Sequence, residues 1–252
     1  MAYELHQKDN FSYLDEGKGQ PLVLLHGLFG SLSNFDDLIA AFSSQYRVLV
    51  PVLPLFELPV REVSVTNLAK HVEAFLINEG LEQAHVLGNS LGGHVGLVLT
   101  LNAPALVKTL TLTGSSGLFE QGLGKTFPRR QSYEYMQENT ANIFYDKSLA
   151  TKELVDDVFA MVNDREKAFA LVMAAKSAMK HNLEDELHQI KVPTLLIWGK
   201  QDTITPPFVA EEFDKKIPNT TLRFIDECGH APMMEKSDLF VKHLQAFLAA
   251  HS

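Results

Sequence analysis

The sequence predicts an α/β fold, in which a mostly parallel central sheet is flanked by helices and carries an inserted helical cap. Short, wholly apolar runs recur along the chain and alternate with segments whose apolar residues have helical spacing. Strands buried on both faces have this continuous apolar character, and they occur in parallel sheets that helices cover. A chain of 252 residues, of which 46% are hydrophobic, is long enough to bury such a core.

The amino-terminal part of the chain predicts two strands and a helix. Residues 11–17 alternate polar and apolar side chains, which indicates a strand on the edge of the sheet followed by a glycine turn. Residues 22–25 are wholly apolar and predict a strand that is buried on both faces. The helix expected next has apolar residues at helical spacing, namely Phe35, Leu38, Ile39 and Phe42.

The following stretch repeats the alternation of strand and helix. A buried strand is expected at 46–53, and the prolines after it make the next loop stiff. A helix can begin at Ser64 or Thr66, and Gly80 is suited to end it in the left-handed conformation. The other elements expected here are strands at 84–87 and 107–113 and an apolar helix at 94–102.

The segment Val86–Gly93, which reads VLGNSLGG, joins a predicted strand to a predicted helix. Ser90 lies between Gly88 and Gly92 in the G-x-S-x-G pattern of a nucleophile elbow. In such a turn the serine has a strained backbone, and its hydroxyl is lifted clear of the sheet. Glycine is expected on either side because a Cβ atom there would collide with neighbouring backbone.

The alternation of strand and helix stops at about Leu118. Residues 118–187 contain no strand-like run and favour helix throughout. We therefore expect residues 1–117 and 188–252 to form one core domain and residues 118–187 to form a helical cap inserted into it. The core is completed by strands at 193–198 and 221–225 and by a helix at about 237–250.

Composition and charge argue against several classes of protein. The formal net charge is −9 and the basic residues form no long cluster, which disfavours nucleic-acid binding. No apolar run reaches the ~18 residues that span a bilayer, so no membrane association is expected. The amino-terminal residues lack the pattern of a secretory signal, and a lone cysteine, Cys228, allows no intrachain disulfide. We therefore expect a cytoplasmic protein, either a monomer or a homodimer.

The residue pattern also predicts that the chain uses neither a metal nor an organic cofactor. No pair of histidines has the spacing of a metal motif such as H-E-x-x-H. The glycines do not form G-x-G-x-x-G after the first strand, which argues against a dinucleotide. The expected partner is a small-molecule substrate.

The side chains that could activate Ser90 follow later strands, and parallel sheets gather their reactive groups at the carboxyl ends of strands. A serine hydroxyl needs a base within hydrogen-bond reach, and histidine suits this role. His230 follows the last predicted strand, and Asp202 follows the strand before it and could orient the imidazole. Asp226 is a competing acid, but it is too near His230 in the sequence for the usual arrangement. The order Ser90, Asp202, His230 is the one that α/β hydrolases use.

Four segments resemble the main signatures of the α/β-hydrolase fold superfamily: HGLFGS, GNSLGG, WGKQDTITP and ECGHAPMMEKSDLF. The resemblance covers about residues 10–114 and 190–250, whereas residues 118–187 are similar only to the family's variable cap. It implies that Ser90 is the nucleophile, His230 the base and Asp202 the carboxylate that orients the base.

The same resemblance implies where the oxyanion of the reaction would be bound. The backbone N–H of Leu91 is the first implied donor. The second comes from the loop after His26, with Leu28 favoured over Phe29. His26 itself is expected to shape this loop and to border the substrate.

The expected function is two-step acyl transfer, in which a small-molecule carboxylic ester is hydrolysed through an acyl-enzyme. After the strand that ends near residue 53 the chain reads VPVLPLFELP, where many relatives have glycine and aspartate. Its proline, leucine and phenylalanine suggest an apolar wall with Phe56 facing the site. An apolar acyl group is therefore expected.

Three other functions stay open at this point. Hydrolysis of a carbon–carbon bond in vinylogous diketone acids is suggested by GNSLGG and TGSSGLF, which are similar to the meta-cleavage product hydrolases. Arg129 and Arg130 could bind the carboxylate of such a substrate, or they could be a solvated basic pair. The loop HGLFG and the Ala-Pro after His230 depart from that group. A perhydrolase is also compatible, and a non-catalytic binding protein would be expected to lack a triad member.

Overall fold

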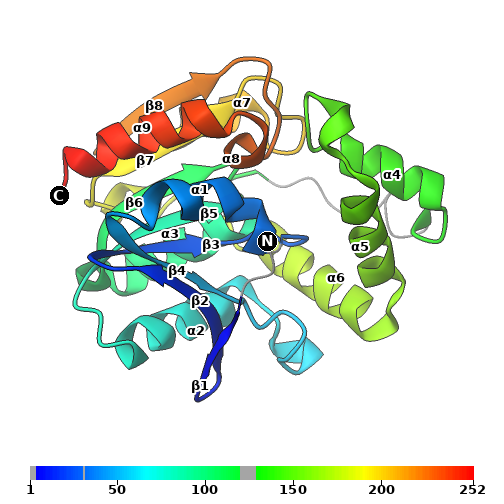
Figure 1. The fold of residues 1–252 in the computed structure, drawn as a ribbon, viewed down its shortest axis with the longest axis horizontal. Helices are drawn as coiled ribbons and strands as arrows, with labels where there is room; N and C mark the ends of the chain where they lie inside the picture. Colours follow the sequence, from blue (N-terminus) through cyan, green and yellow to red (C-terminus); the bar gives the residue numbers. More distant parts are fainter. Residues whose placement is uncertain (1–3, 31, 120–128) are drawn as a thin grey trace.

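The computed structural model describes residues 4–30, 32–119 and 129–252, and the predicted α/β fold is confirmed. The described strands form one eight-stranded sheet in the order β1-β2-β4-β3-β5-β6-β7-β8 (Figure 1). They are β1 (His6–Lys8), β2 (Phe11–Gly17), β3 (Gln20–Leu25), β4 (Tyr46–Pro51), β5 (Ala84–Asn89), β6 (Val107–Thr113), β7 (Thr194–Gly199) and β8 (Thr220–Ile225).

Among the described strands, β4 to β8 pair in parallel, whereas β2 runs in the opposite direction and pairs antiparallel with both β1 and β4. The prediction that residues 11–17 form an edge strand is wrong, because β1 pairs outside β2 in the register His6↔Tyr13. The three residues of β1 are polar and exposed. They have no apolar alternation, so no signal of the usual kind marks them as a strand.

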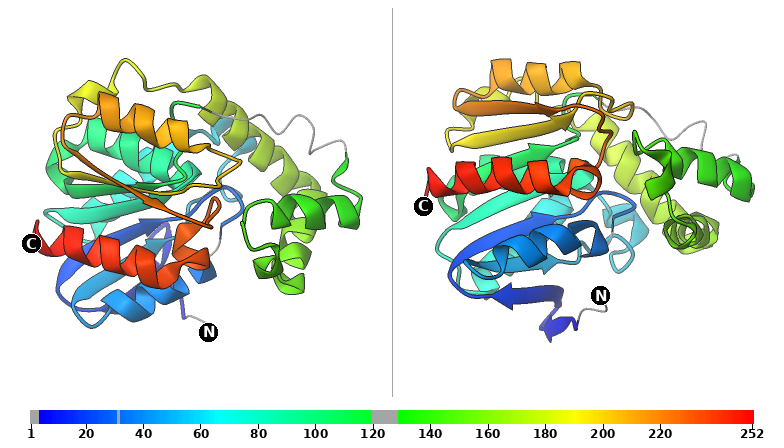
Figure 2. Two further views of the ribbon diagram at one scale, coloured as in Figure 1. Left: turned by 90° about the horizontal axis from the view of Figure 1, so that it is seen from above. Right: turned by 45° about the horizontal axis from the view of Figure 1, so that its top comes forward.

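Helices cover both faces of the sheet (Figure 2). Neighbouring residues of β3 belong to different cores: Val23 packs with α2 (Val65–Asn78), α3 (Leu91–Asn102) and α7 (Pro207–Lys216), whereas Leu24 packs with α1 (Asp36–Phe42) and α9 (Ser237–Ala249). The short helices of the core are α8 (Pro232–Glu235), η1 (Leu32–Phe35), η2 (Val60–Glu62), η3 (Pro104–Leu106) and η7 (Leu187–Gln189). None of the helices in the described part of the chain is long and apolar enough to cross a bilayer.

Local sequence sets the ends of α2 as expected. The hydroxyl of Ser64 accepts a hydrogen bond from the N–H of Asn67 at 3.2 Å and so caps the first turn. Gly80 has φ +66°, and its N–H donates to the carbonyl of Ile77 at 3.0 Å. A glycine in the left-handed conformation therefore ends the helix.

Three longer helices lie between β6 and β7 in the chain, within the segment predicted as a cap. They are α4 (Tyr133–Ala141), α5 (Lys152–Asn163) and α6 (Arg165–Lys180), with η6 (Lys147–Leu149) between the first two. Figure 1 shows them as a group beside one end of the sheet. They share a small apolar cluster made by Met136, Val158, Val162 and Leu171, against which Leu28 and Phe29 of the core also pack. We use the word cap for this group of helices.

Candidate active site

Ser90 lies at the sharp turn between β5 and α3 and has φ 55° and ψ −118°. A positive φ is strained for any residue other than glycine, and it persists only where the surroundings impose it. Here the N–H of Ser90 donates to the carbonyl of Thr113 at 3.1 Å. The carbonyl of Ser90 accepts hydrogen bonds from the N–H groups of His94 and Ser116, both at 3.2 Å. These bonds hold the strained backbone in place.

The two glycines of the elbow are required by space, as the pattern predicts. A Cβ atom at Gly88 would lie 2.3 Å from the carbonyl oxygen of Gly92. A Cβ atom at Gly92 would lie 2.1 Å from the carbonyl oxygen of Leu25, at the end of β3. Both distances are far below van der Waals contact, so the helix could not cross the strands this closely with larger residues.

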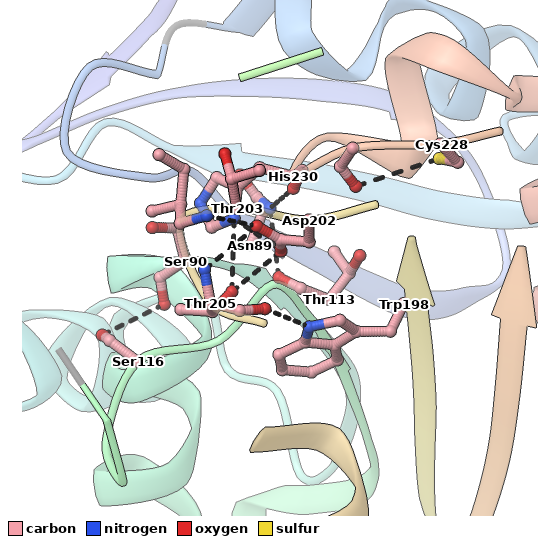
Figure 3. Close-up of polar contacts among 12 residues, drawn as sticks. Asn89, Ser90, Thr113, Ser116, Trp198, Asp202, Thr203, Thr205, Cys228 and His230 are labelled. Carbon is pink, nitrogen blue, oxygen red and sulfur yellow. Dashed lines mark hydrogen bonds and ion pairs between the residues drawn. The ribbon is translucent and has the colours of Figure 1, made fainter. Parts of the chain in front are cut away.

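Asp202 and His230 contact each other at the carboxyl ends of β7 and β8. The Nδ1 atom of His230 lies 2.9 Å from Oδ2 of Asp202, and both side chains are buried (Figure 3). This contact makes Nδ1 the protonated nitrogen of a neutral imidazole and leaves Nε2 as the basic one. Asp226, the competing acid, instead accepts hydrogen bonds from Lys200 and Gln201 and is exposed.

The carboxylate of Asp202 has a full set of partners. Its Oδ1 atom accepts from the N–H groups of Ile204 at 2.8 Å and Thr205 at 3.0 Å, and its Oδ2 atom accepts from the Thr205 hydroxyl at 2.9 Å. The carbonyl of Thr205 in turn accepts from the indole N–H of Trp198 at 2.8 Å. This network fixes the direction in which Asp202 faces His230.

Asn89, the residue before Ser90, ties the elbow to the histidine loop. Its amide nitrogen donates to the carbonyl of His230 at 3.2 Å and to that of Thr113 at 3.0 Å. Ser90 and His230 are thus brought to the same edge of the sheet, as Figure 3 shows. In the described part of the chain no hydrogen bond joins the Ser90 hydroxyl to the imidazole, and in ligand-free enzymes such contacts are often long and tighten on binding.

The loop after β3 lies directly beside Ser90. A Cβ atom at Gly27 would be 3.2 Å from the Cβ of Ser90. The N–H of Gly30 donates to the carbonyl of Gly27 at 3.1 Å, which makes Leu28 and Phe29 the central residues of a tight turn. The N–H of Leu91 is at the first position of α3, where no carbonyl within the helix can accept it. The assignment of Leu91 and of Leu28 or Phe29 as oxyanion donors stays a prediction.

His26 joins two loops and uses both of its ring nitrogens to do so. Its Nδ1 atom lies 2.9 Å from the carbonyl of Gly27, and its Nε2 atom accepts from the N–H of Leu53 at 3.1 Å. Burial lowers the pKa of His26 below its ordinary value, so the ring is neutral and holds the loop after β3 against the loop after β4.

A pocket of about 200 Å³ opens between the loop after β3, the loop after β4 and helix α5. Phe56 lines it, and an exposed lysine of the cap, Lys167, lies over the ring with its Nζ 5.6 Å from the centroid. That Phe56 faces the substrate stays a prediction. The lining is mostly apolar and consists of His26, Leu28, Gly30, Leu32, Val52, Leu53, Leu55, Phe56, Glu57 and Met161.

The structure does not bring Arg129 and Arg130 to this pocket. The guanidinium of Arg129 lies over the ring of Tyr135, 5.3 Å from its centroid. The carbonyl of Arg130 accepts from the side chain of Asn163 at 3.0 Å. Neither residue lines the pocket. Among the described residues, no group of three or more His, Cys, Asp and Glu side chains is arranged to hold a metal.

Sequence reasoning missed Asn89 and Thr205 as parts of the site. Thr205 follows Asp202 by three residues, a spacing at which an aspartate can accept from the backbone and a threonine can bond back to it. That spacing is a usable signal. Asn89 carries no comparable one, because its partner His230 is 141 residues away in the chain.

Comparison with known proteins finds relatives along almost the entire chain. Residues 20–237 match a family model described as the alpha/beta hydrolase fold. The chain is 28% identical to an uncharacterized hydrolase, YugF, of Bacillus subtilis (strain 168), with 94% of this chain and 92% of that protein covered. It is 31% identical to a 2-hydroxy-6-oxononadienedioate/2-hydroxy-6-oxononatrienedioate hydrolase of Paraburkholderia phymatum, with 94% and 90% covered. The crystal structure of MGS-MChE2, an alpha/beta hydrolase enzyme from a lagoon-sediment metagenome, is 39% identical over 98% of both chains, with a TM-score of 0.81.

Proposed function

Because the chain belongs to the α/β hydrolase fold family, we propose that it is a serine hydrolase that cleaves a small-molecule carboxylic ester through an acyl-enzyme on Ser90. The observation that carries the proposal is the 2.9 Å contact between His230 Nδ1 and Asp202 Oδ2 at the sheet edge that also holds the elbow. An imidazole oriented in this way can take a proton at Nε2.

In the proposed reaction each residue has one role. Ser90 Oγ attacks the ester carbonyl while His230 Nε2 takes its proton, and Asp202 stabilises the imidazolium that forms. The backbone N–H of Leu91 and that of Leu28 or Phe29 hold the tetrahedral oxyanion. His230 then gives the proton to the leaving alkoxide. Water, activated by the same imidazole, releases the acid and restores Ser90.

The pocket supports an apolar acyl or alkoxy group in the substrate. The charged residue in its lining is Glu57, a carboxylate, which would repel an acidic substrate group placed there. Arg129 and Arg130 lie outside the lining, and Lys167, which lies over the ring of Phe56, is exposed to solvent. These features favour a neutral ester over an acidic substrate.

The test is hydrolysis of p-nitrophenyl esters from acetate to decanoate. We expect turnover by the wild type and a loss in kcat of about 10⁶-fold in Ser90→Ala, as when the nucleophile of a triad is removed. Ser44→Ala, at an exposed position after α1, is the matched control and should retain full activity. Turnover that survives in Ser90→Ala, or its absence in the wild type across the series, would refute the esterase proposal.

Hydrolysis of a carbon–carbon bond is the second candidate. The relative from Paraburkholderia phymatum favours it, because that protein is named as a hydrolase of 2-hydroxy-6-oxononadienedioate, an acid of the class that this candidate would cleave. One experiment distinguishes the two candidate functions. In it, kcat/KM is measured for the best p-nitrophenyl ester and for a 2-hydroxy-6-oxo-dienoate. We expect the ester to be preferred. A preference for the dienoate would replace the first candidate with the second, with the same catalytic residues.

A further inference from the structure

A pair of histidines, one buried and one partly exposed, joins the cap to the core beside the nucleophile elbow. His94 is fully buried in the first turn of α3, and His181 ends helix α6 of the cap. The Nε2 atom of His94 lies 3.1 Å from Nδ1 of His181, and the two rings stack with centroids 5.2 Å apart and planes 22° apart. The proposed chemistry of Ser90 and His230 uses neither ring.

The pair lies where the two connections between cap and core meet. The chain leaves the core after Gly117 and Leu118 and returns to it at Asn182 and Leu183. The N–H of Leu183 donates to the carbonyl of Gly117 at 2.9 Å, and the side chain of Asn182 donates to the carbonyl of Leu118 at 3.0 Å. These two bonds join the end of α6 to the segment after β6, and His181 lies directly beside them.

Hydrogen bonds continue from the histidines to the backbone of Ser90. The Nδ1 atom of His94 lies 3.3 Å from the hydroxyl of Ser116, and that hydroxyl donates to the carbonyl of Ser90 at 3.4 Å. The hydroxyl of Ser116 thus lies between the imidazole of His94 and the carbonyl of Ser90. On its other side the imidazole of His94 contacts the ring of His181 through Nε2 and also hydrogen-bonds to the backbone of His181.

An imidazole is a costly choice for this position. Burial, with a smaller contribution from the neighbouring His181, lowers the pKa of His94 to about 3, so His94 is neutral at ordinary pH. A hydrocarbon ring would fill a similar space without burying two polar nitrogens. The imidazole adds two directed hydrogen bonds, one toward the cap and one toward Ser116.

We propose that His94 and His181 are a positioning pair that fixes the backbone of Ser90 relative to the cap. The inference rests on the proposed function, because it concerns Ser90 as the nucleophile. The strained turn at Ser90 persists only while its surroundings impose it, and the Ser116 hydroxyl is one of the groups that do so. The pair touches no reacting atom and acts through Ser116.

The test is His94→Phe, which keeps a ring of similar size and removes both hydrogen bonds. We expect kcat for the best ester and the rate at which a fluorophosphonate labels Ser90 to fall together by about 10-fold, because displacement of a reacting group lowers the rate steeply. KM should change by less than about twofold, since no substrate contact is removed. His94→Gln, whose amide can still donate to Ser116, should recover part of the loss.

The pairing itself is tested by a double-variant cycle. His181→Phe breaks the same chain of hydrogen bonds and should lower the labelling rate in the same direction. The double variant His94→Phe/His181→Phe should be no slower than His94→Phe alone, because the second change removes nothing further. Losses that multiply in the double variant overturn the pairing. If His94→Phe fails to fold, His181→Phe and Ser116→Ala carry the test.

His85→Phe is the matched control. His85 is also buried and bonded to a hydroxyl, that of Thr109, but it lies near the start of β5 rather than at the elbow. We expect it to leave kcat and the labelling rate unchanged, whatever it does to thermal stability.

The outcomes are distinct. Wild-type kcat and labelling in a folded His94→Phe enzyme overturn the inference, as does an equal loss in His85→Phe. If the wild type itself neither labels at Ser90 nor turns over an ester, the proposed function fails and the inference fails with it.

Discussion

At the scale of the residue, the site depends on how Asp202 is held rather than on where it stands in the sequence. Both of its oxygens accept hydrogen bonds, from the backbone of Ile204 and from the backbone and hydroxyl of Thr205. Those bonds leave Oδ2 directed at Nδ1 of His230. Asp226 is also an aspartate and is nearer to His230 in the chain, yet its carboxylate is bound by Lys200 and Gln201.

We therefore expect Asp202→Asn to lower kcat for the best ester by about 10⁴-fold, because an amide in this place favours the wrong tautomer of His230. The control is Asp226→Asn, which removes the same charge from an exposed side chain and should leave kcat nearly unchanged. Steady-state kinetics of the two variants decides between the acids. A larger loss in Asp226→Asn would show that the wrong carboxylate has been assigned.

At the scale of the element, the elbow depends on close approach of a helix to two strands. A side chain at position 92 would clash with the backbone carbonyl of Leu25. Gly80, in contrast, has open space around it and is constrained only by its φ of +66°. Glycine is therefore required at position 92 by steric crowding and at position 80 by the left-handed backbone conformation.

Alanine at these two positions should therefore differ in its cost. We expect Gly80→Ala to lower the free energy of unfolding by about 1 kcal/mol, the cost of the left-handed conformation. Gly92→Ala should lower it by about 3 kcal/mol, because the helix must move away from β3. Urea unfolding of both variants measures the difference. Equal losses would mean that the backbone around Gly92 relaxes without strain.

At the scale of the whole molecule, the cap is anchored on the loop that holds His230. The N–H of His230 donates to the carbonyl of Ile143 at 2.7 Å. The carboxylate of Glu235 accepts from the N–H of Gly229 at 2.5 Å and from that of Asp146 at 2.6 Å. Glu235 thus joins the segment after α4 to the loop after β8.

Glu235→Gln should loosen this anchor, because an amide cannot accept at both ends. We expect faster hydrogen exchange at residues 143–146 and a loss in kcat of about 10-fold, consistent with a hydrogen bond to a charged group worth about 1.5–3 kcal/mol. Glu227→Gln, at an exposed glutamate in the same loop, is the control. Unchanged exchange in Glu235→Gln would mean that the anchor does not depend on the carboxylate.

Stability against acid is also a property of the whole molecule, because each buried histidine, such as His85 and His94, contributes to the free energy of unfolding. Burial lowers the pKa of His85 to about 4 and that of His94 to about 3, from an ordinary value of 6.5. Below pH 6.5 the unfolded chain binds protons that the folded chain does not. Stability should therefore fall as the pH is lowered from 6.5 toward 4, with a slope of up to about 1.4 kcal/mol per pH unit for each histidine.

Urea unfolding between pH 7 and pH 4.5 checks this expectation. In His85→Phe the loss of stability with falling pH should be less steep than in the wild type, because one of the histidines that resist protonation is gone. The same pH dependence in both proteins would argue that His85 is not held neutral by burial.

How far the sequence reveals the molecule depends on the distance over which each interaction acts. Some signals lie within a few residues of one another, namely the apolar runs, the Ser64 hydroxyl at the start of α2 and the glycines around Ser90. The elements that these local signals predict are present. Strand β1 was missed because pairing with β2, rather than its own side chains, makes it a strand.

The site follows the same rule. Signature loops place Ser90, Asp202 and His230 after the ends of their strands. The bond from Asn89 to the His230 loop and the contact between His94 and His181 join residues 141 and 87 positions apart. Only the folded chain brings such partners together, and no spacing in the sequence indicates them.

The central claim is that Ser90 is a nucleophile activated by His230, and covalent labelling tests it most directly. The protein is incubated with a fluorophosphonate, and the labelled peptide is mapped by mass spectrometry in the wild type, in Ser90→Ala and in His230→Ala. We predict one label per chain, located on Ser90, lost in Ser90→Ala and greatly slowed in His230→Ala. A label on another residue, or a Ser90 that reacts equally fast without His230, would contradict the account.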